Sequence, residues 1–169
     1  MGRLFAGYPE FNEPLNGWDV SNVTEMEGMF WECYSFNQPL NDWDVSKVVN
    51  MSGMFYSCEK FNQSLNEWVV IEVEEMNGTF NVCEKFDQPL NKWNVTNVVN
   101  MEAMFNECAI FDQPLNEWGL KVGNVDNMEM MFYGCSKFNQ PLNEWDVSNV
   151  TSMYSMFYGC EKFDQPLNE

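Results

Sequence analysis

A repeat of 25 residues is the feature that most constrains how this chain folds. The tryptophans of successive units lie 25 residues apart, except for the last two, which lie 27 apart: Trp18, Trp43, Trp68, Trp93, Trp118 and Trp145. The cysteines keep the same step with the same two-residue excess: Cys33, Cys58, Cys83, Cys108, Cys135 and Cys160. One insertion within residues 119–125 explains both deviations. A unit this short cannot bury its own apolar face, so successive units must stack with equivalent residues above one another.

Each unit contains two apolar patterns within the consensus F-[ND]-Q-P-L-N-x-W-[DN]-V-S-x-V-x-x-M-x-x-M-F-x-x-C. In residues 40–45, Trp43 and Val45 lie two apart, which predicts a short strand. In residues 23–33 the apolar positions share one stripe of a helix: Val23, Met26, Met29, Phe30 and Cys33. We therefore expect an α/β solenoid of about six stacked 25-residue strand–helix units, with a short parallel sheet on one face and helices on the other.

Two further columns follow from this expectation. Hydroxyl residues just before the apolar stripe are predicted to cap the helices: Ser21, Ser46, Thr96 and Ser148. Small residues beside the stripe are predicted to let neighbouring helices approach closely: Gly28, Gly53, Gly78, Ala103 and Ser155. Met130 interrupts that column, in the unit that carries the insertion.

The charge excludes several classes of function. The chain has 26 acidic and 8 basic residues and a net charge of −18, so it has no basic face for nucleic acid. It has no histidine, which removes Ser-His and Cys-His nucleophile pairs and His-containing zinc sites. No apolar run of about 18 residues predicts a membrane span. No secretory signal is visible at the N-terminus, so an exporting segment would have to lie outside this sequence.

The recurring F-N-Q-P-L-N-x-W-D-V-S, Met-Phe and following Cys resemble the BspA-like leucine-rich-repeat surface proteins, in the 25-residue branch abundant in mycoplasma lipoproteins. The resemblance runs from Phe11 to the end of the chain. It implies a leucine-rich-repeat-like fold, exposure on a surface, and adhesion or protein binding without catalytic residues. The sequence departs from the pattern at residues 68–71, at Ser64, at Thr79 and after Trp118.

The cysteines and asparagines are expected to be structural. All six cysteines share one column, so their side chains point the same way, which argues against disulfides and a zinc site and favours buried free thiols. We expect no metal, no cofactor and no catalytic residue. The asparagines after Pro-Leu are expected to point inward and bind loop backbone: Asn16, Asn41, Asn66, Asn91, Asn116, Asn143 and Asn168.

The residues that flank each tryptophan form an acidic ribbon on the predicted strand face. Because strand faces of solenoids commonly bind partners, this acidic ribbon is the leading candidate site. Its members are Asp19, Asp42, Asp44, Glu67, Asn94, Glu117, Glu144 and Asp146. The alternative is that these carboxylates only keep the face solvated and unpaired.

A second candidate site is an aromatic column just after Met-Phe. Its members are Trp31, Tyr56, Tyr133 and Tyr158, with Asn81 and Asn106 between them. Exposed aromatic side chains are enriched in binding surfaces, whereas burial between neighbouring helices is the alternative.

These observations predict one solenoid domain over residues 1–169, with a lead-in at 1–10, repeats at 11–169 and no C-terminal cap. We expect a non-enzymatic, surface-exposed repeat protein for adhesion or protein binding; the alternative is a structural component of a surface layer, envelope or virus particle. The expected partner is a protein or glycan, basic or cation-bridged, and uncapped ends would permit end-to-end self-association. The expected location is the cell surface or extracellular space, with a virion or intracellular location as the alternative.

Overall fold

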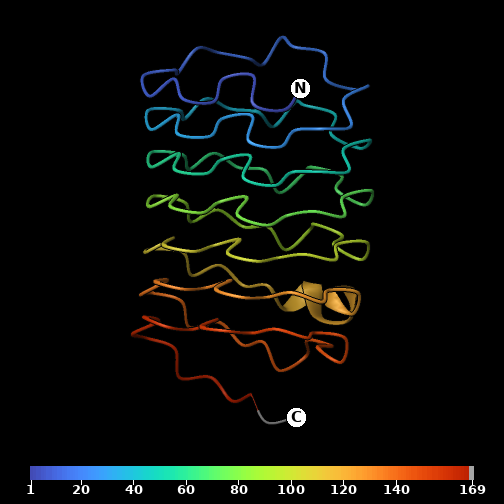
Figure 1. The fold of residues 1–169 in the computed structure, drawn as a ribbon, viewed down its shortest axis with the longest axis vertical. Coiled ribbons are helices and arrows are strands. Elements are labelled where there is room, and N and C mark those ends of the chain that lie inside the picture. The colour runs from blue at the N-terminus through green and yellow to red at the C-terminus, as the bar shows by residue number, and fades with distance from the viewer. Residues whose placement is uncertain (168–169) are drawn as a thin grey trace.

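The chain winds into a column of stacked coils, where one coil is one 25-residue turn of the chain. The computed structural model describes residues 1–167, and it places the two ends of the chain at opposite ends of the column (Figure 1). Neighbouring coils meet at isolated parallel bridges between equivalent residues: Glu25–Asn50, Asn50–Glu75, Glu75–Asn100, Asn100–Asn127 and Asn127–Ser152. Residues 1–10 join this stack, because the amide of Phe5 donates to the carbonyl of Met29 at 2.9 Å.

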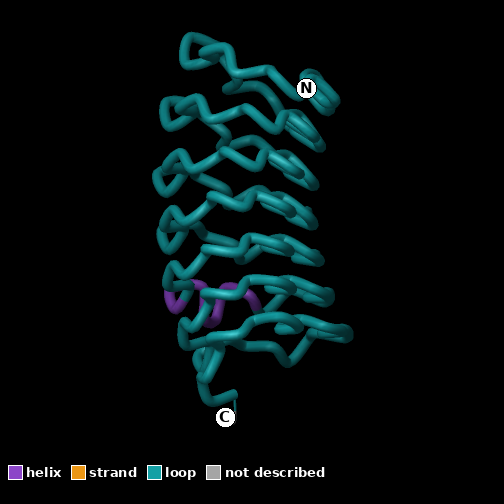
Figure 2. The backbone as a smooth tube through the Cα atoms, turned by 90° about the vertical axis from the view of Figure 1, so that its left-hand side faces the viewer, coloured by secondary structure: helices purple, strands orange, loops and turns teal. Residues whose placement is uncertain are grey.

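Within residues 1–167, the 3-10 helix η1, Asn116–Val122, is the only regular element (Figure 2). It lies where the period lengthens from 25 to 27 residues. The tryptophan column continues across it, since the rings of Trp118 and Trp145 stack at 6.3 Å between centroids. The helix therefore absorbs the two extra residues and leaves the neighbouring columns in register.

The expected α/β solenoid is wrong, and its helices fail for a backbone reason. Gly28 and Glu32, inside the predicted helix, have φ of +55° and +59°, in the left-handed region that an α-helix excludes. Alternate amides then point to the next coil, so that Met26 donates to Asn50 and Phe30 donates to Met54, each at 2.9 Å. Residues 23–33 therefore form linked turns that bind the next coil.

The predicted strands and parallel sheet are also wrong for the part of the chain that the structure describes. In residues 40–48 the amides are used locally, because Trp43 donates to Leu40 at 3.1 Å and Val48 donates to Val45 at 3.0 Å. These four-residue turns leave no row of amides for a neighbouring strand. Within residues 1–167, the isolated bridges given above are the only β-bridges between coils.

The column of small residues also has a different role from the one expected. Its members all have positive φ, including Met130 at +52°, so the column marks a left-handed turn rather than a close approach of helices. Glycine adopts this conformation without the penalty that a Cβ introduces. The values for the other members are Gly28 +55°, Gly53 +57°, Gly78 +61°, Ala103 +52° and Ser155 +54°.

The core consists of columns of identical apolar side chains that run through the stack. Phe30 stacks on Phe36 of its own coil at 4.0 Å and on Phe55 of the next coil at 5.6 Å. Trp68 and Trp93 stack at 6.4 Å with an interplanar angle of 2°. Full burial of each such side chain contributes roughly 1.5–3 kcal/mol, so the stacked columns supply the main stabilisation.

Polar groups inside the core bond to the preceding coil. The indole Nε1 of Trp93 donates to the carbonyl of Leu65 at 2.8 Å, and the thiol of Cys83 donates to that of Phe55 at 3.0 Å. Thr79, which departs from the repeat, has its hydroxyl 2.8 Å from the carbonyl oxygen of Met76. Across residues 1–167, every buried side-chain nitrogen and oxygen has a hydrogen-bond partner.

The inward polar column was predicted at the wrong position. The side-chain oxygen of Asn37 accepts the backbone amide of Asn62 at 2.9 Å and the side-chain NH2 group of Gln63 at 3.0 Å. The residues equivalent to Asn37 repeat the hydrogen bond to a backbone amide of the next coil. In the predicted column, only Asn66 accepts a backbone amide of the next coil, from Lys92 at 3.0 Å. Most of the predicted column is exposed or half-buried, and Asn168 lies outside the described residues.

Two glycines in the left-handed column differ in their surroundings and provide a test of this geometry. A Cβ on Gly53 would lie 2.8 Å from Cζ3 of Trp31, whereas a Cβ on Gly78 would meet nothing closer than 3.8 Å. Left-handed strain of about 1–2 kcal/mol applies to both Gly53→Ala and Gly78→Ala. We therefore expect Gly53→Ala to lower the free energy of unfolding more than Gly78→Ala, as measured by urea denaturation. An equal or smaller loss for Gly53→Ala would contradict the placement of Trp31.

Candidate binding surfaces

The acidic ribbon predicted from the sequence is accessible in the structure. Its members lie at equivalent positions of successive coils, and all are exposed except Asp146, which is half-buried. Within residues 1–167 only two ion pairs form, Arg3–Glu27 at 2.9 Å and Lys92–Glu67. Asp19 and Asp44 lie near Lys47, and the remaining ribbon carboxylates other than Glu67 form no ion pair within these residues.

Several ribbon residues also shape the turn that follows each tryptophan. The Asp19 carboxylate accepts the amide of Ser21 at 3.0 Å and its hydroxyl at 2.6 Å. Asn94 accepts the hydroxyl of Thr96 at 2.6 Å in the same way. The serines and Thr96 were expected to cap helices. They instead donate to the residue two positions before them.

These turns stabilise the charged form of three aspartates of the acidic ribbon. The Ser21 hydroxyl, and then its amide, lowers the pKa of Asp19, and Ser46 and Ser148 do the same for Asp44 and Asp146. Hydrogen bonds to a carboxylate stabilise its charged form. Asp19, Asp44 and Asp146 therefore keep their negative charge below the pH at which an ordinary aspartate is protonated.

The acidic ribbon is interrupted near its middle, which the sequence pattern alone did not emphasise. Val69 takes the place of the aspartate and is 56% exposed. The ion pair with Lys92 neutralises Glu67. The ribbon thus consists of two acidic stretches, separated by two coils that carry Val69, Lys92 and Asn94 at the ribbon positions.

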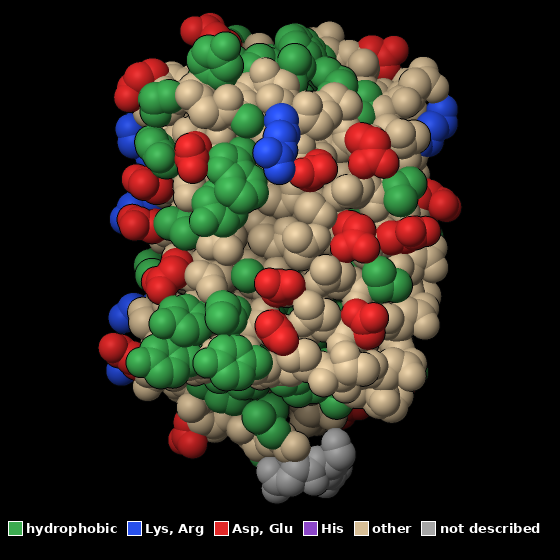
Figure 3. Space-filling view, in the orientation of Figure 1, with side chains coloured by type: hydrophobic (Ala, Val, Ile, Leu, Met, Phe, Trp, Pro, Cys, Tyr) green, Lys and Arg blue, Asp and Glu red, His purple; other side chains and the backbone are tan. Residues whose placement is uncertain are grey.

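The structure divides the predicted aromatic column into two pairs. The rings of Trp31 and Tyr56 stack at 3.8 Å with an interplanar angle of 5°, and those of Tyr133 and Tyr158 stack at 4.9 Å. Tyr158 is exposed and the other three rings are half-buried. On one face of the molecule, apolar side chains gather in two patches with polar and acidic surface between them (Figure 3). Part of the column is therefore accessible, and its half-buried rings lie against one another rather than between helices.

A groove of about 260 Å³ adjoins the first aromatic pair. Gly78, Ala103 and Tyr56 line it, and Asn77 and Glu102 contribute polar groups. The sequence analysis missed this groove, because it depends on the left-handed turn and on the short side chain of Asn81.

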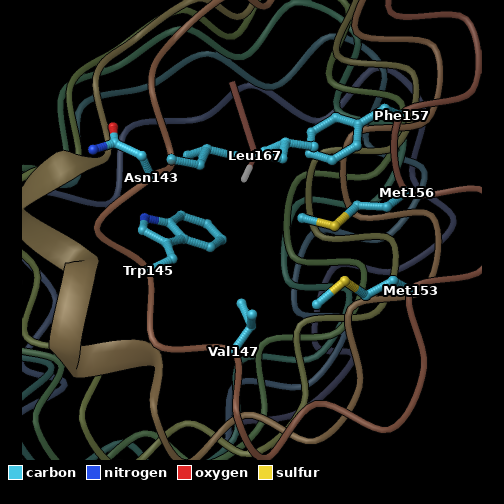
Figure 4. Close-up of a pocket in the computed structure, with 8 residues that line it drawn as sticks. Asn143, Trp145, Val147, Met153, Met156, Phe157 and Leu167 are labelled. Atoms are coloured by element: carbon cyan, nitrogen blue, oxygen red, sulfur yellow. The ribbon is translucent and has the colours of Figure 1, made fainter. Parts of the chain in front are cut away.

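A smaller pocket of about 140 Å³ is lined by apolar residues of the last coil (Figure 4). Leu142, Trp145 and Met156 line it, and they belong to the core columns. Its lining therefore continues the core and presents few polar groups to a ligand.

The cysteines are free thiols, of which Cys160 is half-buried and the other five are buried. Within the described residues, no group of three or more Cys, Asp or Glu side chains is placed to hold a metal ion. Within residues 1–167, no helix is long and apolar enough to cross a membrane.

Fold and surfaces together define a repeat protein whose stacked coils present fixed columns of side chains to solvent. The sequence matches a protein family described as "Mycoplasma protein of unknown function, DUF285" over residues 1–89 and again over residues 65–169. The chain belongs to this family. No curated protein and no solved structure matches the chain.

The buried thiols make stability depend on pH. Burial raises the pKa of Cys33 and Cys160 from 9.0 to about 11, and raises those of Cys83 and Cys108 further. Below pH 9 both folded and unfolded states keep these protons; above it the unfolded state loses them first, so unfolding becomes more favourable. We expect the free energy of unfolding to fall as the pH rises from about 9 towards 11, as measured by urea denaturation.

A cysteine variant separates this effect from other titrating groups. Cys83→Ala combined with Cys108→Ala removes two of the titrating thiols, so its stability should fall less steeply over the same pH range. The same slope in both proteins would show that the thiols do not cause the loss.

Proposed function

We propose that the chain is a non-enzymatic binding module of a BspA-like surface protein and that it holds a basic protein partner on the acidic ribbon. The observation that supports this most directly is the exposure of the ribbon carboxylates with few cations beside them. Complementary charge accelerates association and excludes like-charged partners. The net charge of −18 adds long-range attraction for a basic partner.

The turns of the acidic ribbon also favour recognition. The hydrogen bonds from Ser21, Ser46 and Ser148 hold the aspartates in defined positions before any partner arrives. Less side-chain entropy is then lost on binding than with freely rotating carboxylates. The apolar coil at Val69, between the two acidic stretches, provides contact area in the same surface.

A surface location and an adhesive role follow from the same proposal. They are supported by the mycoplasma family match and by the residue pattern shared with BspA-like surface proteins. A non-enzymatic role is supported by the repetition of equivalent side chains along the stack, since identical columns do not create one distinctive catalytic pocket.

The proposal is tested by neutralising the acidic ribbon without removing its turns. The variant Asp42→Asn, Asp44→Asn, Glu144→Gln, Asp146→Asn keeps the acceptor oxygens, as Asn94 does naturally with Thr96. Binding of an octalysine peptide, measured by calorimetry at low and physiological salt, should weaken at least about tenfold. An octaglutamate peptide should bind neither protein.

A second variant with the same change in charge is the control. Glu10, Glu59, Glu84 and Glu161 are exposed and lie outside the acidic ribbon, so changing all four to glutamine should alter octalysine binding far less. Equal weakening by both variants would mean that only the overall charge matters and would overturn the proposed site.

A further inference from the structure

The groove beside Tyr56 exists because the aromatic column is interrupted. Trp31 covers one face of the Tyr56 ring at 3.8 Å. In the next two coils the equivalent residues are Asn81 and Asn106, and the aromatic residues resume only at Tyr133. The second face of Tyr56 is therefore turned toward a coil that offers no ring to stack on it.

The glycines show where the surface is filled and where it is open. The Trp31 ring reaches over Gly53, since a Cβ there would lie 2.8 Å from Cζ3 of the ring. A Cβ on Gly78 would lie 4.0 Å from the nearest ring atom, Cδ2 of Tyr56. The groove of about 260 Å³ runs past both rings, from Arg3 and Glu27 beside Trp31 to Asn81, Glu102 and Ala103 beyond Tyr56.

The polar groups of the groove have hydrogen-bonding capacity left over. Asn77 accepts the Ser52 hydroxyl at 2.6 Å, and its own NH2 group has no acceptor within the described residues. The side chain of Asn81 makes no hydrogen bond to any part of residues 1–167. Glu102 accepts one bond from Asn127 at 3.2 Å, so its carboxylate retains further acceptor positions.

The charges of the groove disfavour an anionic ligand. Its single cation, Arg3, is paired with Glu27 at 2.9 Å and lies over the Trp31 ring at 5.8 Å. Glu27 and Glu102 both line the groove, in a chain of net charge −18. A phosphate, sulfate or carboxylate ligand would meet repulsion without a free cation to offset it.

We propose that this groove is a binding site for a neutral oligosaccharide. Sugar hydroxyl groups both donate and accept, which matches the free amides of Asn77 and Asn81 together with the Glu102 carboxylate. The apolar face of a sugar ring matches the uncovered face of Tyr56. The groove is slightly below the roughly 300–1,000 Å³ of drug-sized pockets, so it takes a short segment of a glycan chain.

The direction of the gap favours a chain over a single ring. Tyr56 and Tyr133 stand three coils apart, about 14 Å at the roughly 4.8 Å spacing of bridged backbones. Asn106 continues the polar surface between them. This site uses different residues from the acidic ribbon and a ligand of different charge, so it stands independently of the proposed protein-binding role.

The test uses an array of neutral hexose and N-acetylhexosamine oligosaccharides, with sulfated and sialylated glycans and an uncharged peptide on the same array. The wild-type chain should bind neutral glycans, and calorimetry with the best one should give a dissociation constant near or below about 1 mM. Asn81→Tyr continues the aromatic column, as tyrosine does at the equivalent positions in other coils, and fills the groove. It should fold normally and bind at least about tenfold more weakly.

Two control proteins make the outcome specific. Tyr34→Ala removes an exposed ring outside the groove and should bind like wild type. The ribbon variant with Asp42, Asp44, Glu144 and Asp146 neutralised should also retain glycan binding, even if its octalysine binding is lost. Absence of binding to every neutral glycan, a preference for anionic glycans or the peptide, or undiminished binding by a folded Asn81→Tyr protein would overturn the proposal.

Discussion

The hydrogen bonds between coils are the constraint on which the rest of this structure depends. In residues 26–32 alternate amides donate to the next coil, as Met26 does to Asn50 and Gly28 does to Ser52. This pattern requires a left-handed residue at fixed places in every coil. It also requires each coil to contain nearly the same number of residues, because equivalent groups must lie opposite one another. Repeat length, glycine positions and stacked core columns all follow from that requirement.

The sequence predicted which residues are buried far better than it predicted the backbone that buries them. The spacing of Met26, Met29, Phe30 and Cys33 is typical of a helix, but a series of four-residue turns places the same residues inside. Glycine at position 28 within a predicted helix was a warning, since it is a poor helix former. The left-handed conformation of Glu32 could not be inferred, because glutamate carries no such signal. It follows from tertiary contact between coils.

For the candidate surfaces too, the sequence predicted which residues are exposed but not how the backbone arranges them. The acidic ribbon was predictable from charge alone, and its members are accessible. The aspartates' second role, as acceptors that shape their own turns, needed the positions of Ser21 and its equivalents in space. Asn81 looked in the sequence like a simple gap in an aromatic column. The groove that this gap creates became visible only once the left-handed turn at Gly78 was placed beside Tyr56.

The helix η1 shows how a chain of this kind can vary in length. Two extra residues between Trp118 and Trp145 are accommodated at one corner, and the two indoles still stack at 6.3 Å. Leu120 in η1 is 84% exposed, while Trp118 and Val122 of the same helix stay in the core. This corner is therefore a position where evolution can lengthen a coil, and where an engineer can insert a foreign peptide, without shifting the register of the coils on either side.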